Sequence, residues 1–343
     1  MPGKINLEEL EKLARQMVAK GRGILAADES SGTIEKKFAK IGVPSTEDLR
    51  REYRGLFFTS EGFGEYISGV ILYDETIRQS HADGRRFVSI IEDAGVLPGI
   101  KVDQGLKEME SSPNENVTKG LEGLPERLKE YAELGAKFAK WRAVITIGER
   151  IPTDANIRQN AKDLAAYAKH CQEAGLVPIV EPEVLMDGTH PIEKCEEASD
   201  RTLRAIFEEI EKAGVALSGM ILKTNMVLPA KENPSGKASP EEIALRTVNL
   251  FRKVLPDELP GQAFLSGGQS EVEATENLNA INKMGPHPWN LTFSYGRALQ
   301  DSALRAWSGK SENIPAAQKA FLHRAKMNSL ATLGKYSKDL EIV

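Results

Sequence analysis

Lys223 is the residue with the clearest potential for chemistry in this sequence. It directly follows the apolar run Met220–Leu222, which is typical of a buried strand. Burial disfavours the charged form of an amine, so a lysine at the end of such a strand can act as a nucleophile. The alternative is a strand-end lysine whose stem is buried while its charged head reaches water. The residues that the fold brings to Lys223 decide between the two.

Other charged residues also stand at the ends of short apolar runs. They are Asp28, Lys101, Lys140, Arg142, Glu181, Glu183 and Arg297. If the runs are parallel strands of a barrel, these residues converge on one rim, where barrel enzymes hold their active sites. Buried salt bridges are the structural alternative, but desolvation makes such networks costly, so the convergence favours a function.

This set of residues suits the attack of an amine on a carbonyl. Clustered ammonium groups disfavour one another's charge, which favours a nucleophilic lysine. Glu181 and Glu183 share a side of their strand and are candidates for transferring protons as a carbinolamine hydroxyl leaves. Asp28, across the barrel, is a candidate base for a substrate hydroxyl. The cationic residues favour an anionic substrate.

Two glycine-containing segments predict a phosphate site. They are LSGG at 265–268 and SYGR at 294–297, on consecutive predicted strands. Glycine pairs alone usually mark turns, but barrels often bind phosphate at these two positions through backbone N–H groups and an arginine. The residues expected there are Ser266, Gly267, Ser294, Gly296 and Arg297. A second anion site is expected across the mouth, from Ser30, Thr33, Lys101 and Arg142. A substrate with a phosphate at each end and a carbonyl between them matches both sites.

The elements that must position these residues form eight units. Short apolar runs, most followed by a helical pattern, occur at residues 24–27, 68–75, 97–105, 138–147, 176–185, 218–228, 262–270 and 289–299. This alternation predicts an α/β fold, a single-domain (β/α)₈ TIM barrel over residues 1–343. An N-terminal helix with Leu7, Leu10, Leu13 and Met17 on one face, two C-terminal helices and a short flexible tail at 337–343 complete it. Helices are expected to begin near Ile34, near residue 196 and, for the first C-terminal helix, near residue 299. Ser239 with Glu242 and Ser270 with Glu273 predict capping boxes at two further helix starts. An open doubly wound sheet is the alternative, but no G-x-G-x-x-G opens the first helix.

Composition narrows the class of protein. The 343 residues are 41% hydrophobic and 28% charged, which indicates a soluble globular chain, and the net charge of −5 argues against nucleic-acid binding. The two cysteines and five histidines show no metal-ligand spacing. Residues 1–21 contain no apolar core of the kind that a signal peptide has, and no apolar run approaches the roughly 20 residues of a membrane span. We therefore expect a cytoplasmic protein without a metal or a membrane partner.

Seven motifs resemble the class I (Schiff-base) fructose-bisphosphate aldolases almost word for word. They are GILAADES, GIKVD, FAKWR, VPIVEPE, LK-NMV, FLSGGQSE and LTFSYGRALQ, and the resemblance runs from about residue 20 to 336. It implies a barrel, usually a homotetramer, that reversibly cleaves fructose 1,6-bisphosphate to dihydroxyacetone phosphate and glyceraldehyde 3-phosphate in glycolysis and gluconeogenesis. It implies no metal or organic cofactor, since the lysine iminium acts as the electron sink.

The resemblance also assigns roles. Lys223 corresponds to the Schiff-base lysine, Glu181 to the general acid/base, and Glu183 to its hydrogen-bonding partner near the lysine. Asp28 corresponds to the acceptor of the C4 hydroxyl proton, and Lys140 to the lysine that holds the substrate during iminium formation. The family's C1-phosphate residues match Ser266, Gly267, Gly296 and Arg297, and its C6-phosphate residues match Ser30, Thr33, Lys101 and Arg142.

Three departures from the family pattern stand out. Thr224 occupies the place of a common proline, and Thr33 that of a common serine. Many relatives also continue for some twenty residues and end in a tyrosine that speeds proton exchange on the enamine. Here the last tyrosine is Tyr336 and the sequence ends at Val343, so we expect cleavage that does not rely on such a tyrosine.

Three alternatives remain open at the level of sequence. A phosphosugar isomerase on the same barrel would need only a carboxylate base. A binding or scaffolding protein with an inactive barrel need not keep Asp28, Lys140, Glu181 and Lys223 together. A metal-dependent aldolase is disfavoured by the spacing of the histidines.

Overall fold

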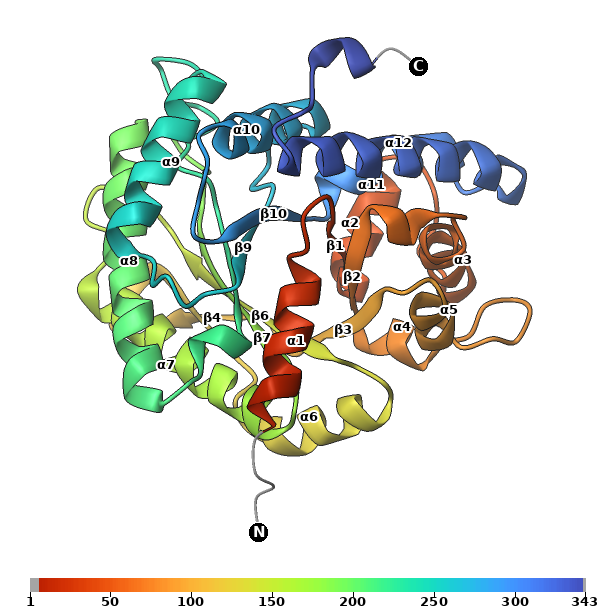
Figure 1. Ribbon diagram of the computed structural model, residues 1–343, viewed down its shortest axis with the longest axis horizontal. Helices are drawn as coiled ribbons and strands as arrows, with labels where there is room; N and C mark the ends of the chain where they lie inside the picture. Colours follow the sequence, from red (N-terminus) through yellow and green to blue (C-terminus); the bar gives the residue numbers. More distant parts are fainter. Residues whose placement is uncertain (1–5, 342–343) are drawn as a thin grey trace.

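The computed structural model describes residues 6–341, and eight parallel strands in it close into a barrel (Figure 1). The order around the barrel is β1-β10-β9-β8-β7-β6-β3-β2. The strands are β1 Gly23–Ala27, β2 Ile67–Leu72, β3 Leu97–Lys101, β6 Phe138–Ile145, β7 Val177–Val184, β8 Ile221–Thr224, β9 Gly261–Phe264 and β10 Asn290–Tyr295. The predicted (β/α)₈ barrel is confirmed, and the open-sheet alternative is wrong.

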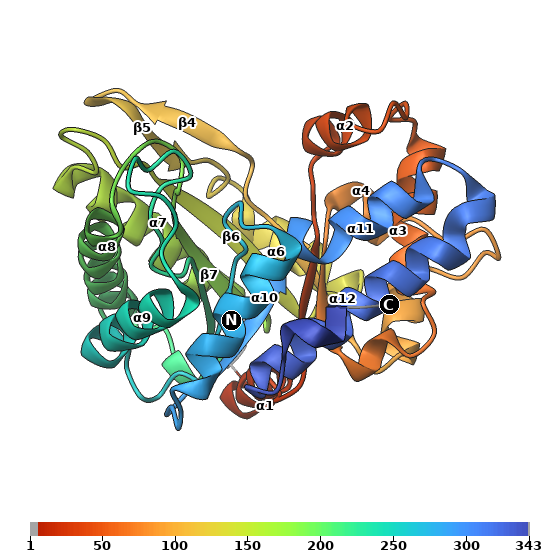
Figure 2. The same ribbon diagram turned by 90° about the horizontal axis from the view of Figure 1, so that it is seen from above.

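Helices surround the barrel and link its strands (Figures 1 and 2). They are α2 Ser31–Ala39, α3 Glu47–Phe58, α4 Asp74–Arg78, α5 Phe87–Asp93, α6 Leu124–Glu133, α7 Asp154–Glu173, α8 Ile192–Ala213, α9 Pro240–Val254, α10 Glu271–Lys283, α11 Arg297–Trp307 and α12 Ile314–Thr332. Short 3₁₀ helices occupy Phe63–Glu65, Leu217–Gly219, Ser311–Asn313 and Lys338–Glu341. The apolar faces of the helices bury the outer side of the barrel in one large core.

Helix α1, Leu7–Met17, closes the end of the barrel where the strands begin (Figure 1). Leu10, Leu13 and Met17 are buried in one cluster with inward residues of the barrel such as Ile24 and Phe138. The predicted apolar face of this helix is confirmed except at Leu7, which is 38% exposed. The opposite end of the barrel is therefore the end left for a site.

A polar hairpin is the element that the sequence pattern did not reveal. Residues 111–126, expected to form a loop-rich passage, contain strand β5 Ser112–Thr118, which pairs in antiparallel fashion with β4 Leu106–Met109. Their side chains are mostly exposed, so the apolar alternation that marks a half-buried strand is absent. Figure 2 shows this hairpin and α2 on the side of the barrel opposite to α1.

The starts of α9 and α10 agree with the capping signals in the sequence. Ser239 accepts a hydrogen bond from the Glu242 N–H at the start of α9, and Ser270 and Glu273 form the predicted capping box of α10. Three helices begin earlier than expected: α2 at Ser31, α8 at Ile192 and α11 at Arg297.

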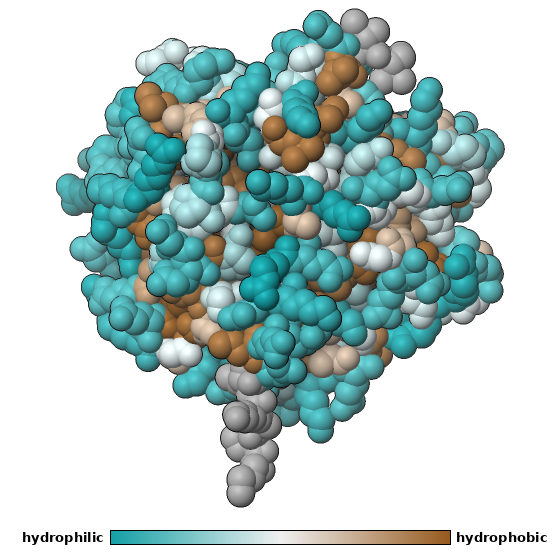
Figure 3. All heavy atoms as spheres, viewed as in Figure 1, coloured by the Kyte–Doolittle hydropathy of each residue, from teal (hydrophilic) through white to brown (hydrophobic). Residues whose placement is uncertain are grey.

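The C-terminal segment folds back on the helices outside the barrel. Glu341 forms an ion pair with the buried Arg324 of α12 at 2.5 Å and accepts a hydrogen bond from the Tyr336 hydroxyl. Residues 342–343 of the predicted tail lie outside the described part of the chain, and the flexibility of the tail stays a prediction. The face that carries α1, α10 and α12 is mostly hydrophilic, with hydrophobic residues in small separate patches (Figure 3).

Candidate active site

Four charged side chains, three on strands β6, β7 and β8 and one directly after β1, form one buried cluster. Lys140 Nζ lies 2.7 Å from Asp28 Oδ2 and 3.4 Å from Glu181 Oε2. Glu181 Oε1 lies 3.2 Å from Lys223 Nζ. Lys140, Glu181 and Lys223 are each at most 4% exposed. The charges therefore alternate in sign along the chain of contacts Asp28–Lys140–Glu181–Lys223.

Barrel geometry explains why these residues meet. Strands β6, β7 and β8 are neighbours, and the register pairs Arg142 with Glu181 and Lys223 with Ala263. Ala263 and Ile221, two residues before Lys223, both belong to the apolar cluster inside the barrel. Because side chains alternate along a strand, Lys223 points to the same interior. Apolar residues thus fill the lower barrel and leave the charged layer above them.

Opposite charges keep the central pair ionised. Burial raises the pKa of Asp28, but the ammonium groups of Lys140, Lys223 and Lys101 outweigh it and lower the pKa to about 2, from an ordinary 3.8. Burial lowers the pKa of Lys140, yet the carboxylates of Asp28, Glu181 and Asp103 raise it above its ordinary value. At neutral pH Asp28 is therefore a carboxylate and Lys140 an ammonium ion.

Two further ion pairs flank this cluster. Arg142 donates to Glu183, and Lys101 Nζ lies 2.6 Å from Asp103 Oδ1. Burial lowers the pKa of Arg142, but the carboxylates of Glu183 and Glu181 leave it raised overall. Glu183 thus contacts Arg142 in this structure, while Glu181 is the carboxylate beside Lys223.

A cavity of about 630 Å³ opens above the cluster. Of the predicted site residues, it is lined by Asp28, Ser30, Thr33, Lys101, Lys140, Arg142, Gly296 and Arg297. Lys223, Glu181, Glu183, Ser266, Gly267 and Ser294 are not among its lining residues. Lys223 and Glu181 join it through Lys140, so the cavity mouth and the buried lysine form one connected site.

Both predicted phosphate segments contain backbone features that occur at anion sites. Gly267 and Gly268 have φ of +56° and +91°, a left-handed conformation that favours glycine and turns successive N–H groups toward one side. Gly296 directly precedes α11, whose first residue is Arg297. A helix N-terminus attracts negative charge, and a Cβ at Gly296 would lie 3.3 Å from the Ala26 carbonyl oxygen. The Ser294 hydroxyl is buried without a hydrogen-bond partner among the described residues.

Several residues of the site escaped the sequence reasoning. Asp103 pairs with Lys101, and the cavity is also lined by Glu29, Lys36, Lys37, Lys40 and Arg305. Asp103 could have been found from the sequence, because it follows an apolar strand as Asp28 does. Lys36 and Lys37 of α2 could not have been found in this way, because charged residues on a helix usually face solvent.

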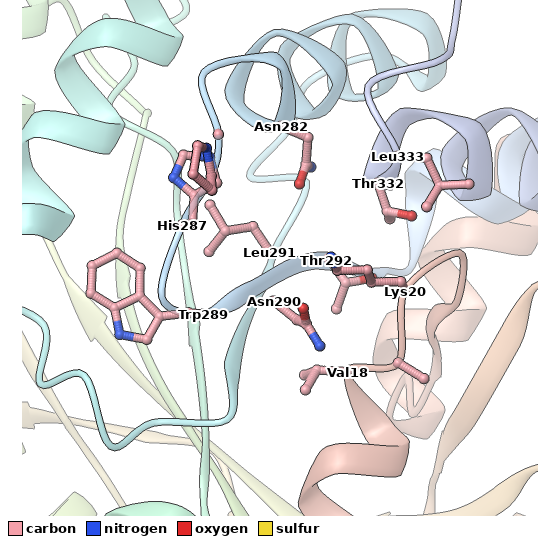
Figure 4. Close-up of a pocket in the computed structure, with 13 residues that line it drawn as sticks. Val18, Lys20, Asn282, His287, Trp289, Asn290, Leu291, Thr292, Thr332 and Leu333 are labelled. Atoms are coloured by element: carbon pink, nitrogen blue, oxygen red, sulfur yellow. The ribbon is translucent and has the colours of Figure 1, made fainter.

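A second cavity, of about 220 Å³, lies at the other end of β10 (Figure 4). Its lining includes Val18, Lys20, His287, Asn290 and Thr332. Asn290 begins β10, whereas Gly296 and Arg297 of the predicted phosphate site follow its last residue, Tyr295. This cavity is therefore separate from the charged cluster.

Among residues 6–341, no helix is long and apolar enough to cross a membrane. In the same part of the chain, no three His, Cys, Asp or Glu side chains are grouped so as to hold a metal ion.

Enzymes built on parallel barrels hold their active sites at the carboxyl ends of the strands, and the cationic lining of this cavity suits an anionic substrate. Comparison with known proteins narrows the class. Residues 9–342 match the family model described as fructose-bisphosphate aldolase class-I. The cytosolic fructose-bisphosphate aldolase 4 of Arabidopsis thaliana is 53% identical over 98% of this chain and 86% of the relative. A probable class 1 fructose-bisphosphate aldolase of Xanthomonas campestris is 50% identical over 97% of this chain and 99% of the relative.

This structure is also similar to a solved structure of the same family. It is a fructose-bisphosphate aldolase of Plasmodium falciparum, in complex with TRAP and a small-molecule inhibitor. The TM-score is 0.95 at 48% identity, with 96% of each chain covered. The chain belongs to the class I fructose-bisphosphate aldolase family. It is a lyase of glycolysis that reversibly cleaves a phosphosugar, fructose 1,6-bisphosphate, to dihydroxyacetone phosphate and glyceraldehyde 3-phosphate.

Proposed function

We propose that Lys223 carries this cleavage as a Schiff base, with Glu181, Lys140 and Asp28 moving the protons. The observation that carries the proposal is the contact of 3.2 Å between Lys223 Nζ and Glu181 Oε1 in a setting almost closed to water. A carboxylate at this distance can take a proton from the ammonium group and leave a nucleophilic amine.

Iminium formation uses Lys223 and Glu181. The amine attacks C2 of the ketose, the C–N bond forms, and the carbonyl oxygen takes the proton that Glu181 received. The attacking nitrogen then gives one proton to Glu181, which passes it to this hydroxyl. The hydroxyl leaves as water while the freed nitrogen lone pair forms the iminium ion. Lys140, 3.4 Å from Glu181, holds the carboxylate and stabilises the negative charge that develops on oxygen. Glu183, held by Arg142, is the second carboxylate on the same side of β7.

Cleavage uses Asp28 on the other side of Lys140. Asp28 is ionised at neutral pH and accepts the proton of the C4 hydroxyl. The C4–O bond becomes a carbonyl, and the electrons of the C3–C4 bond move into the iminium to give an enamine. Glyceraldehyde 3-phosphate leaves at this point. Asp28 then loses its proton to water, and a proton from water enters the enamine at C3. Hydrolysis of the resulting iminium releases dihydroxyacetone phosphate and restores Lys223.

The two phosphates occupy opposite sides of the mouth. For the C1 phosphate we propose the left-handed turn at Gly267, the start of α11 and three side chains, Ser266, Ser294 and Arg297. For the C6 phosphate we propose Ser30, Thr33, Lys101 and Arg142, which all line the cavity of about 630 Å³. Lys101 and Arg142 are already paired with Asp103 and Glu183, so these carboxylates keep both cations in place.

Borohydride trapping tests the assignment of Lys223. Reduction in the presence of dihydroxyacetone phosphate should attach the triose covalently, and peptide mapping should find it on Lys223. Lys223→Met should abolish trapping, and an isomerase would give none in either form. Trapping that persists in Lys223→Met, or activity that vanishes in EDTA, contradicts the proposal. Repeating the trap with fructose 1-phosphate and sedoheptulose 1,7-bisphosphate ranks the substrates.

We propose further that the chain works in the cytoplasm as a homotetramer. The cytosolic and cytoplasmic names of its plant relatives support the location, and the usual assembly of the family supports the tetramer. Light scattering on the purified protein tests the assembly: a mass near four times the 37.7 kDa of the chain is expected, and a monomer contradicts it.

A further inference from the structure

The backbone on either side of Asp28 lies beyond the ladder of β1. The strand ends at Ala27, which pairs with Leu72 of β2, and residues 28–30 belong to no helix or strand. Asp28 therefore needs another support to hold its carboxylate at the 2.7 Å contact with Lys140.

That support comes from Arg54 on α3, which is 2% exposed. Its Nη1 donates to the Ala27 carbonyl, and its Nη2 donates to the Glu29 carbonyl at 3.1 Å. These are the two carbonyls that flank Asp28. The same Nη2 lies 3.0 Å from Glu29 Oε2, and Nη1 also donates to the Thr76 hydroxyl at 3.1 Å. The planar guanidinium thus fixes three consecutive residues from outside the barrel.

A second helix strengthens the same support. Gln300 of α11 is fully buried and donates through Nε2 to the Ala26 carbonyl at 2.6 Å. Its Oε1 accepts hydrogen bonds from the Tyr53 hydroxyl at 2.9 Å and from Lys37 Nζ at 2.5 Å. Lys37 also lies 2.9 Å from Glu29 Oε1. Helices α3 and α11 lie on the same side of the barrel as β1 (Figures 1 and 2).

We propose that Arg54 is a positioning residue for Asp28, which it holds against Lys140 by binding the carbonyls of Ala27 and Glu29. This inference rests on the proposed role of Asp28 as the acceptor of the C4 hydroxyl proton. A buried guanidinium is costly, and here its donors converge on the one strand end that carries that base. Arg54 touches neither Lys223 nor Glu181, so its loss separates cleavage from Schiff-base formation.

The experiment compares these two steps in Arg54→Lys and Arg54→Met. Cleavage of fructose 1,6-bisphosphate is measured per borohydride-trapped site, so that misfolded protein is not counted. Proton exchange at the hydroxymethyl carbon of dihydroxyacetone phosphate, which is C3 in fructose 1,6-bisphosphate, reports on protonation of the enamine. This step does not need Asp28. We expect cleavage to fall about 30-fold, since small misplacements of a reacting group cost up to about 100-fold, while exchange changes less than about 2-fold. If neither Arg54 variant folds, Gln300→Met, which removes the bond to Ala26, should give the same separation.

Two comparisons distinguish positioning from a merely structural role. Arg324→Lys alters another buried arginine, on α12, and should lower the melting temperature without changing cleavage per trapped site. In the Asp28→Asn background, Arg54→Lys should change cleavage less than about 2-fold, because it acts through Asp28. Equal losses of cleavage and exchange in the Arg54 variants, or an undiminished effect in the Asp28→Asn background, would overturn the inference. If Asp28→Asn does not itself separate cleavage from exchange, the proposed role of Asp28 and the inference both fail.

Discussion

At the scale of single residues, Lys140 is the centre of the site. It lies between the carboxylate proposed for cleavage and the one proposed for iminium formation, at 2.7 Å and 3.4 Å. A cation shared in this way keeps two buried carboxylates close together without mutual repulsion. The same residue therefore links two chemical steps that occur at different carbons of the substrate.

Lys140→Met should change the pH dependence of cleavage as well as its rate. Without this ammonium group, burial is less fully offset and the pKa of Asp28 rises from about 2. Asp28 is then protonated at a higher pH than in the unaltered protein. The acid limb of the plot of kcat against pH should therefore shift to higher pH. The kcat of this variant should be at least about 100-fold below that of the unaltered protein, because 100-fold is the lower end of general acid–base effects.

Lys36→Met is the matched control for that profile. Lys36 lines the same cavity but is not among the groups that shift the pKa of Asp28. Its acid limb should coincide with that of the unaltered protein. An acid limb in Lys140→Met that stays in place would show that Asp28 is not the group that titrates in the cleavage step.

At the scale of elements, the β4–β5 hairpin supports the rim of the barrel. Glu115 of β5 is 1% exposed and accepts hydrogen bonds from the Thr153 N–H at 2.8 Å and hydroxyl at 2.6 Å, at the start of α7. The Thr118 hydroxyl donates to the Arg142 carbonyl at 2.7 Å. The hairpin therefore ties α7 to the strand that carries Lys140 and Arg142.

Glu115→Gln should destabilise the protein by about 1–3 kcal/mol, because an amide cannot accept all the hydrogen bonds that this carboxylate accepts. Glu108→Gln, on the exposed strand β4, is the matched control and should cost less than about 0.5 kcal/mol. Urea unfolding at neutral pH measures both. Equal losses would mean that the hairpin adds no specific support.

The C-terminal segment offers a second test at this scale. Deleting residues 337–343 removes Glu341, the carboxylate that pairs with the buried Arg324. We expect the melting temperature to fall, because Arg324 loses its counter-ion, and proton exchange into dihydroxyacetone phosphate to continue. Exchange that disappears in the truncated protein would show that this segment reaches the enamine. Glu341→Gln separates loss of the ion pair from loss of the chain.

The contrast between apolar and polar elements explains what the sequence could predict. The eight barrel strands are buried, so their apolar runs and the acids and lysines that end them are visible in the sequence. The hairpin strands are exposed, and their pairing depends on contacts with α7 that no local pattern records. Arg54 escaped notice for a related reason: within EDLRREYRGLFF it is one of three arginines, and only the packing of α3 distinguishes it.

At the scale of the whole molecule, the barrel has one closed end and one open end. Helix α1 covers the strand starts with apolar residues, while the charged layer lies above the apolar interior and the cavity of about 630 Å³ opens over it. In such a division, the apolar residues at the closed end stabilise the fold, and the charged residues at the open end serve the reaction.

Leu10→Ala and Leu7→Ala test this division on a single helix. Leu10 is 1% exposed in the cluster that fills the barrel end, and Leu7 is 38% exposed on the same helix. We expect Leu10→Ala to lower the free energy of unfolding by about 2–5 kcal/mol. Leu7→Ala should lower it by less than about 0.5 kcal/mol. The KM for fructose 1,6-bisphosphate should be unchanged in both, since the substrate cavity is at the opposite end. Urea unfolding and steady-state kinetics measure the two quantities, and a raised KM in Leu10→Ala with little loss of stability would show that the closed end also shapes the site.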